Sequence, residues 1–250
     1  MNHLLSKIGS YPFEKLNLLH KDIKPSKEII NLSIGEPKLN ADSKVLDILN
    51  KETNSFSNYP PMNAVPELSE AYRQYLKNHF GIENVAEDEV CLVAGTREGT
   101  FSIIQALFNK ENVKEKPYVV MPNPFYQIYG GATTLAGGEA KFLDCPEEDN
   151  FQPDLDSLKS EDWQKCQILV LCSPNNPTGS VLPLSKLKNI LDLAEKYDFY
   201  VVSDECYVDL YTTEKSCPSI LQASSDRSDR LIALHSLSLI HISEPTRQIR

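Results

Sequence analysis

Two short segments of the sequence carry side chains that suit the binding of a polar ring. Residues 173–179, Ser-Pro-Asn-Asn-Pro-Thr-Gly, follow an apolar run at 168–172, and we expect the two prolines to hold this loop extended while Asn176 offers its amide to a ligand oxygen. Asp204 closes a second apolar run at 199–203, and a buried carboxylate is costly unless it is paired. A cationic ring nitrogen would be such a partner. Two simpler interpretations remain open, an ordinary turn at the asparagine segment and an aspartate bonded to backbone amides.

A glycine turn lies earlier in the chain, where a ligand's anionic group could bind. Gly95, Thr96 and Arg97 follow an apolar run at 90–93 and precede a helical pattern at 96–108. Free N–H groups and the positive end of the helix dipole attract an anion at such a turn, and glycine lets the backbone approach closely. Because every strand-to-helix unit has some such turn, a purely structural role is the alternative. The segment matches neither of the common glycine-rich nucleotide motifs.

An aromatic segment supplies a surface on which a planar ligand could stack. Residues 123–129, Asn-Pro-Phe-Tyr-Gln-Ile-Tyr, begin just after the apolar run at 118–121, where open α/β sheets bind ligands. One of these rings could stack on a planar cofactor. The alternative is that the aromatic side chains only cap the core.

The elements that position these segments alternate between apolar, β-rich runs and helical patterns from about Ile48 onward. This alternation predicts an α/β fold, with a mostly parallel sheet that is covered by helices. Short unbroken apolar runs suit strands that are buried on both faces. We expect strands at 90–93, 118–121, 140–143, 168–172, 199–203 and 231–234.

Two amphipathic helices are predicted to pack against this sheet. Ser185 is expected to cap a helix whose apolar residues recur at 187, 190, 191 and 194. A second helix should begin at Pro66 and end before Gly81, with one face made by Leu68, Ala71, Tyr72, Tyr75 and Leu76. Both apolar stripes are interpreted as packing.

The sequence divides into three parts. Residues 1–45 predict an arm outside the main sheet, with a weak helix at 12–19 and an extended segment at 29–34. Residues 46–238 carry the α/β pattern, and 239–250 form a tail unlike the preceding chain.

Charge and composition exclude several classes of function. A formal net charge of −10 and a pI near 5.0 argue against a nucleic-acid partner, which would demand clustered Lys and Arg. The six cysteines are scattered without metal-binding spacing, and we expect reduced thiols. No run approaches the length of a membrane span and no signal peptide is evident, so the cytoplasm is the expected compartment.

Taken in order, these segments resemble a fold-type-I, pyridoxal-phosphate-dependent aminotransferase of class I/II. The resemblance covers residues 11–238. It is closest to the bacterial succinyldiaminopimelate transaminases of lysine biosynthesis, on the motifs at 12–16, 32–37, 95–98, 123–129, 203–207 and 235–238. It implies a three-layer α/β/α large domain, incomplete here, with the small domain represented only by the N-terminal arm.

The resemblance also implies roles for individual residues around pyridoxal 5′-phosphate. Asp204 would keep the ring nitrogen protonated, Asn176 and Tyr207 would bond the phenolic oxygen, and Tyr126 would stack on the ring. The phosphate would be held by Gly95, Thr96, Arg97 and Ser236. Tyr59 would reach the phosphate of a partner subunit, which implies a homodimer, and Gly35 would lie near the substrate carboxylate.

One position departs from the family. Where the family has the lysine that forms a Schiff base with the cofactor and then moves a proton, this chain has Leu239. Leucine can do neither, so we expect no transamination by the chain as written. Residues 237–247 resemble a translated sequencing adapter, which predicts a truncated gene and a non-native tail at 239–250.

The expected parent enzyme transfers an amino group between N-succinyl-LL-2,6-diaminopimelate and 2-oxoglutarate. Another amino-acid transaminase or a carbon–sulfur lyase of the same fold is the first alternative. A non-catalytic module that binds the cofactor is the second. A nicotinamide-binding domain is disfavoured because the chain lacks the glycine fingerprint and the ribose-binding acid.

Overall fold

A computed structural model describes residues 2–9, 11–30, 42–57, 65–111, 117–210, 216–224 and 229–237. Its strands are β1 (Tyr118–Asn123), β2 (Glu139–Asp144), β3 (Cys166–Cys172), β4 (Tyr200–Asp204) and β5 (Leu231–Leu234). The helices are α1 (Pro12–His20), α2 (Ser43–Lys51), α3 (Pro66–Phe80), α4 (Thr96–Leu107), α5 (Gln127–Ala136), α6 (Ser160–Trp163), α7 (Leu184–Tyr197) and α8 (Leu221–Ser224). Short 3₁₀ turns lie at His3–Lys7, Thr53–Ser57, Glu87–Glu89, Glu147–Asp149 and Leu155–Ser157.

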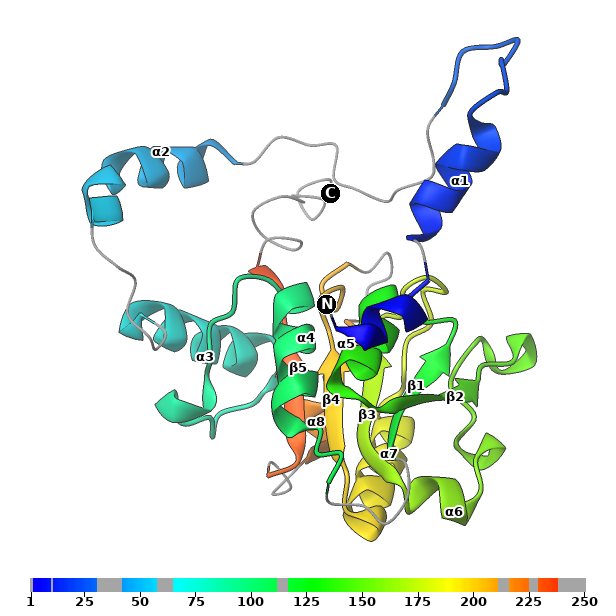
Figure 1. The fold of residues 1–250 in the computed structure, drawn as a ribbon. Helices are drawn as coiled ribbons and strands as arrows, with labels where there is room; N and C mark the ends of the chain where they lie inside the picture. Colours follow the sequence, from blue (N-terminus) through cyan, green and yellow to red (C-terminus); the bar gives the residue numbers. More distant parts are fainter. Residues whose placement is uncertain are drawn as a thin grey trace.

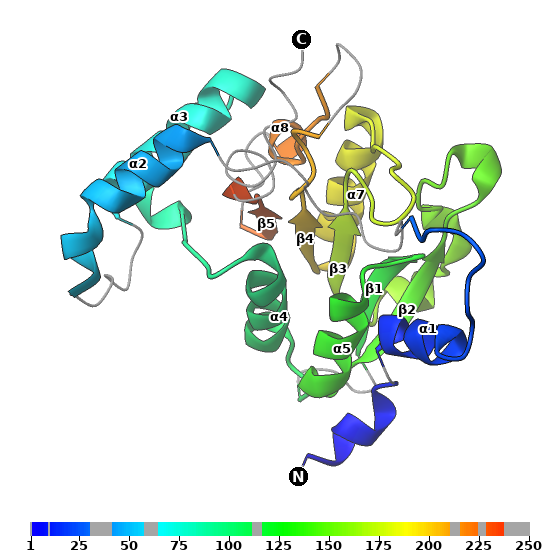
Figure 2. The same cartoon turned by 90° about the horizontal axis from the view of Figure 1, so that it is seen from above.

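The five strands form one parallel sheet in the order β2-β1-β3-β4-β5 (Figure 1). Helices α4 and α5 lie on one face of this sheet, and α7 and α8 lie on the other (Figure 2). This arrangement confirms the α/β fold that the alternation of strand and helix patterns predicts.

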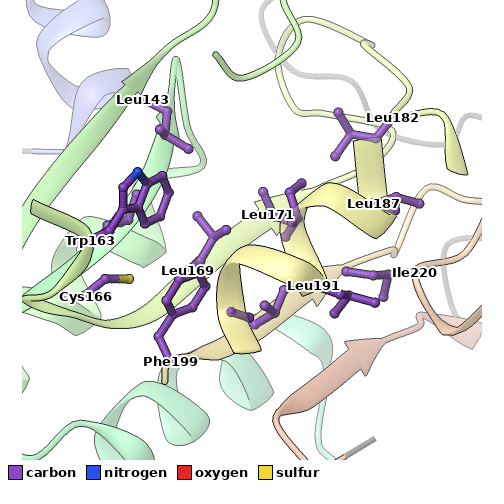
Figure 3. Close-up of a cluster of buried hydrophobic side chains, with 14 of the residues drawn as sticks. Leu143, Trp163, Cys166, Leu169, Leu171, Leu182, Leu187, Leu191, Phe199 and Ile220 are labelled. Atoms are coloured by element: carbon purple, nitrogen blue, oxygen red, sulfur yellow. The ribbon is translucent and has the colours of Figure 1, made fainter. Parts of the chain in front are cut away.

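Burial on both faces explains why these strands are unbroken apolar runs. In β3, Ile168 and Val170 pack in the cluster that includes α4 and α5. Their neighbours Leu169 and Leu171 point to the opposite face and pack with α7, in the cluster drawn in Figure 3. Successive residues of one strand therefore serve two separate cores, and no polar alternation is left in the sequence.

The strand expected at 90–93 is wrong, because the structure has no strand there. A strand needs a hydrogen-bonded neighbour, and β5 is the edge of the sheet in the described part of the chain. Leu92 and Val93 remain 44% and 46% exposed. The apolar run indicates that this segment favours burial. Whether it forms a strand depends on a neighbouring strand, which the run itself does not predict.

The two amphipathic helices occur where they are predicted, with one error of capping. Helix α3 begins with Pro66 and ends at Phe80, and Gly81 follows at the C-cap with φ 70°. Helix α7 begins one residue before Ser185, with Pro183 at the N-cap and no side-chain cap. The proline ring fixes an extended backbone at φ −73°, so the helix starts there and Ser185 falls in its first turn.

The N-terminal residues contribute no strand to the described sheet. The weak helix expected at 12–19 is confirmed as α1. The extended segment expected at 29–34 lies mostly outside the described residues. Among the helices that the structure describes, none is both long and apolar enough to cross a membrane.

Candidate functional site

The carboxyl ends of the parallel strands gather most of the predicted site residues at one edge of the sheet. Cys172 at the end of β3 pairs in register with Asp204 at the end of β4. The backbone N–H of Glu205 donates to the carbonyl of Leu234, the last residue of β5, over 2.8 Å. The loops that follow β3, β4 and β5 therefore leave the sheet side by side.

Asp204 is the most deeply buried of the predicted ligand-binding side chains, at 4% exposure. The hydroxyl of Tyr129 donates to its Oδ2 over 2.8 Å, and the backbone N–H of Cys206 lies 3.4 Å from its Oδ1. Burial raises the pKa of Asp204 above its ordinary value, although the bond from Tyr129 opposes this shift. Since both donors are neutral, the carboxylate would be stabilised further by a cation.

Tyr129 is the site residue that sequence reasoning missed. It is fully buried on α5, and burial raises the pKa of its phenol, so it remains a hydrogen-bond donor to Asp204 at neutral pH. Tyr126 lies one turn earlier at the N-cap of α5, is half-buried, and meets Tyr129 edge to face at 5.8 Å. The i, i+3 spacing of two tyrosines after a strand was the available signal.

The N-terminus of α4 provides the glycine turn expected from the sequence. Gly95 occupies the N-cap with φ 120° and ψ 150°, and no side chain caps the helix. This φ lies in a region that residues with a Cβ rarely adopt, so glycine suits the position, whereas the nearest atom to an added Cβ, Oε2 of Glu98 at 2.9 Å, is the end of a flexible side chain that can move. Thr96 and Arg97 form the first turn of the helix, and the side chain of Arg97 is exposed. The turn therefore has the donors and the dipole that an anion requires.

The asparagine segment after β3 is a compact turn, so the expectation of an extended loop is wrong. The N–H of Gly179 donates to the carbonyl of Asn175 over 2.7 Å, and the N–H of Asn175 donates to Ser180 over 2.8 Å. The side chain of Asn175 is buried and donates to the hydroxyl of Thr178 over 2.8 Å. The backbone bonds of this turn outweigh the stiffness of the prolines, and they leave Asn176 as the partly exposed amide at the edge of the sheet.

The remaining predicted residues divide into two groups. Tyr207 follows β4, is half-buried, and burial raises its pKa to about 12, so it is a phenol that can donate a hydrogen bond. Ser236 follows β5 by two residues. Gly35, Tyr59 and Leu239 lie outside the described residues.

The donors and acceptors at this edge fit a ligand that has an anionic group, a planar ring and a cationic ring nitrogen. An uncapped helix end with a glycine at positive φ suits the anion. A half-buried tyrosine ring suits stacking, and a buried carboxylate with a raised pKa suits the cation.

Comparisons with known proteins give matches that cover most of the chain. A sequence profile of the family "Aminotransferase class I and II" matches residues 27–238. The LL-diaminopimelate aminotransferase of Aquifex aeolicus is 29% identical over 237 residues, which cover 94% of this chain. An aspartate aminotransferase of Pyrococcus horikoshii is 29% identical over 208 residues, or 82% of this chain and 52% of that protein.

A solved structure of an aminotransferase is similar to this chain over most of its length. The crystal structure of an aminotransferase from Neisseria meningitidis superposes with a TM-score of 0.88 and 39% identity, over 95% of this chain and 61% of that one. The chain spans about 60% of the length of the LL-diaminopimelate aminotransferase from Aquifex aeolicus.

Proposed function

The chain belongs to the aminotransferase class I and II family, and we propose that the edge formed by β3, β4, β5 and α4 binds pyridoxal 5′-phosphate. Members of this family use that cofactor. When bound, it supplies an electron sink for the carbanion that forms at the Cα of an amino acid. The observation that supports the proposal most directly is the buried carboxylate of Asp204, which accepts only from neutral donors among the described residues.

Around the ring, Asp204 holds the proton on the ring nitrogen, and Tyr129 orients Asp204 through its 2.8 Å bond. Asn176 and Tyr207 donate to the phenolic oxygen, which the raised pKa of Tyr207 favours because the phenol keeps its proton. Tyr126 stacks on one face of the ring.

The phosphate is bound by Gly95, Thr96 and Arg97 at the start of α4, and by Ser236 after β5. Backbone N–H groups and the helix dipole favour its charge, and the guanidinium of Arg97 adds charge-assisted bonds. Tyr59 reaches the phosphate of a partner subunit, so we propose a homodimer. Gly35 lies near the carboxylate of the substrate.

The chain as written does not transaminate, because Leu239 has no amine to bind the cofactor or to move the proton at Cα. A parent enzyme with lysine at this position would transfer an amino group between N-succinyl-LL-2,6-diaminopimelate and 2-oxoglutarate in lysine biosynthesis. The name of the Aquifex relative supports a diaminopimelate-type donor, without the succinyl group. Another amino-acid transaminase is the alternative, which the aspartate aminotransferase relative favours. All six cysteines are free thiols, which supports a cytoplasmic protein.

Calorimetric titration with pyridoxal 5′-phosphate tests the cofactor site. We expect saturable binding by the chain and a loss of roughly 10- to 150-fold in affinity for Asp204→Asn, since a hydrogen bond to a charged group contributes about 1.5–3 kcal/mol. Asp162→Asn is the matched control. Asp162 on α6 pairs with Lys141 on β2, away from the carboxyl ends of the strands. Equal affinity for Asp204→Asn and the wild type would contradict the proposal.

The amino donor is tested with the cofactor-loaded chain, because binding does not require turnover. N-succinyl-LL-diaminopimelate, LL-diaminopimelate and aspartate are compared as ligands by the change in cofactor absorbance. If the succinyl compound binds most tightly, the proposed donor is supported. If LL-diaminopimelate or aspartate binds most tightly, that compound is the better candidate and the proposed donor is wrong.

A further inference from the structure

A second set of buried polar side chains lies directly behind the proposed site and takes no part in the contacts assigned to the cofactor. The side chains of His235 and Glu205 are 2% and 1% exposed. Nε2 of His235 lies 3.1 Å from Oε2 of Glu205, and Nδ1 lies 2.6 Å from the hydroxyl of Tyr72 on α3. We call these three residues the buried relay.

The partners of Glu205 leave one of its oxygens facing His235. Oε1 of Glu205 accepts from the hydroxyl of Ser203 over 3.0 Å and from the N–H of Ile220 over 2.8 Å, which leaves Oε2 for His235. Neither Oε2 nor Nε2 makes a hydrogen bond with a described residue, so their 3.1 Å approach is a close polar contact between two buried atoms that have no other partner there.

The phenol of Tyr72 keeps its proton, because burial, helped by the charge of Glu205, raises its pKa. Its hydroxyl lies 2.6 Å from Nδ1 of His235, so the phenol and the imidazole share one hydrogen bond, and the other ring nitrogen, Nε2, faces Glu205.

The relay connects helix α3 with the segments that follow β4 and β5, next to two residues of the proposed site. Glu205 is the residue after Asp204, and His235 is the residue before Ser236. Tyr72 belongs to α3, whose Tyr75 and Phe80 also pack around the imidazole at centroid distances of 6.1 and 6.0 Å. The bond to Tyr72 and the contact with Glu205 therefore hold His235, and with it the adjacent Ser236, relative to Asp204 at the end of β4.

We propose that His235, held by Tyr72 and Glu205, is a positioning residue that fixes Ser236 for the phosphate of the cofactor. The inference rests on the proposed cofactor site. The stripe of apolar and tyrosine side chains on α3 predicts only packing. Under this proposal α3 also contributes to phosphate binding, indirectly, through the bond between Tyr72 and His235.

Tyr72→Phe tests this role by removing one hydroxyl while keeping the ring. We expect the dissociation constant for pyridoxal 5′-phosphate to rise about tenfold, equivalent to about 1.4 kcal/mol, and that for pyridoxal, which lacks the phosphate, to change less than twofold. Tyr75→Phe is the matched control: it removes a hydroxyl from the same helix, and that hydroxyl donates to Asp209 over 2.8 Å outside the relay. Both dissociation constants of the control should stay within twofold of the wild type.

The outcomes separate the inference from the function on which it rests. If the wild type binds pyridoxal as tightly as pyridoxal 5′-phosphate, the phosphate site and the relay's role both fail. If the wild type prefers the phosphate and Tyr72→Phe keeps the whole preference, or Tyr75→Phe loses as much of it, only the positioning role fails.

A measurement on the wild type decides the case in which Tyr72→Phe does not fold. The ¹⁵N chemical shifts of His235 should report a proton on Nε2, the nitrogen that faces Glu205. An imidazole protonated on Nδ1 alone would overturn the relay.

Discussion

Replacing Asp204 by asparagine removes the charge of the buried carboxylate at the end of β4 but keeps its size. In the wild type this side chain is 4% exposed, accepts a short bond from Tyr129 and a long contact from the amide of Cys206, and is also bonded by the Cys206 side chain. A carboxylate that exists to bind a cation should be poorly stabilised without its ligand. A carboxylate that is structural should be well stabilised by backbone amides, and its loss should weaken the fold.

The raised pKa of Asp204 determines the sign of the effect. Below the ordinary carboxyl value of 3.8, the side chain is protonated in the folded and unfolded states, and burial costs no ionisation energy. As the pH rises from 3.8 through the raised value, the unfolded state loses its proton first, so the stability of the wild type falls across this window. Each unit of elevation lowers the free energy of unfolding at neutral pH by about 1.4 kcal/mol.

Asparagine does not titrate, so Asp204→Asn escapes this loss. Relative to the wild type, the variant should gain stability from acid to neutral pH, and each unit of elevation should add about 3–6 °C to its midpoint for a chain of this size. The stronger bond that Tyr129 makes to the ionised carboxylate is already part of the net elevation of the pKa, so it does not enter this difference a second time.

Thermal unfolding without ligand, followed by circular dichroism from about pH 2.5 to 7.5, measures the difference between the two proteins on both sides of the ordinary carboxyl value. Other titrating groups are common to both and cancel. Asp162→Asn is the control of opposite sign: its bond to Lys141 lowers the pKa of Asp162, so its contribution is present above pH 3.8 and is lost in acid. That control should cost about 0.2–1 kcal/mol at neutral pH. A variant Asp204→Asn that becomes less stable than the wild type as the pH rises would refute the reasoning.

Three further predictions concern the same site. Gly95→Ala should lower the free energy of unfolding by about 1–3 kcal/mol in urea titrations, because alanine is strained at φ 120°; an unchanged midpoint contradicts it. Tyr129→Phe should cost about 1.5–3 kcal/mol at neutral pH and less in acid, where Asp204 is protonated, and a loss independent of pH would argue against a charged acceptor. Borohydride reduction of the wild type with pyridoxal 5′-phosphate should leave no adduct in the pocket because Leu239 has no amine; an adduct that mass spectrometry maps to a lysine beside Asp204 opposes this.

The sheet could be predicted because each strand is buried on both faces. Five of the six expected strands occur, since alternate residues of a run such as 168–172 serve two cores and leave an unbroken apolar signal. The run at 90–93 has the same signal but no strand. Apolar composition records how much a segment favours burial, whereas pairing depends on a neighbour elsewhere in the chain.

The edge at which the candidate site lies could also be predicted, because the carboxyl ends of parallel strands meet at one edge. The turn at Asn175 and the start of α7 at Pro183 could not, since both depend on backbone bonds that compete with the local preferences of proline and serine. The bond from Tyr129 to Asp204 joins residues 75 positions apart, and no spacing rule reaches that far.

The tyrosines of α3 make hydrogen bonds that the apolar spacing of the helix does not predict. The spacing of Leu68, Tyr72, Tyr75 and Leu76 predicts a buried face, and helix packing alone would be satisfied by phenylalanine. A buried hydroxyl is costly unless it is bonded, so a tyrosine in such a stripe predicts a polar partner on the surface it covers. Tyr72 finds His235 and Tyr75 finds Asp209, both on segments that follow strands of the sheet. Helix α3 is therefore bound to the edge that carries the proposed site by directional bonds, and these fix its position more narrowly than apolar contact does.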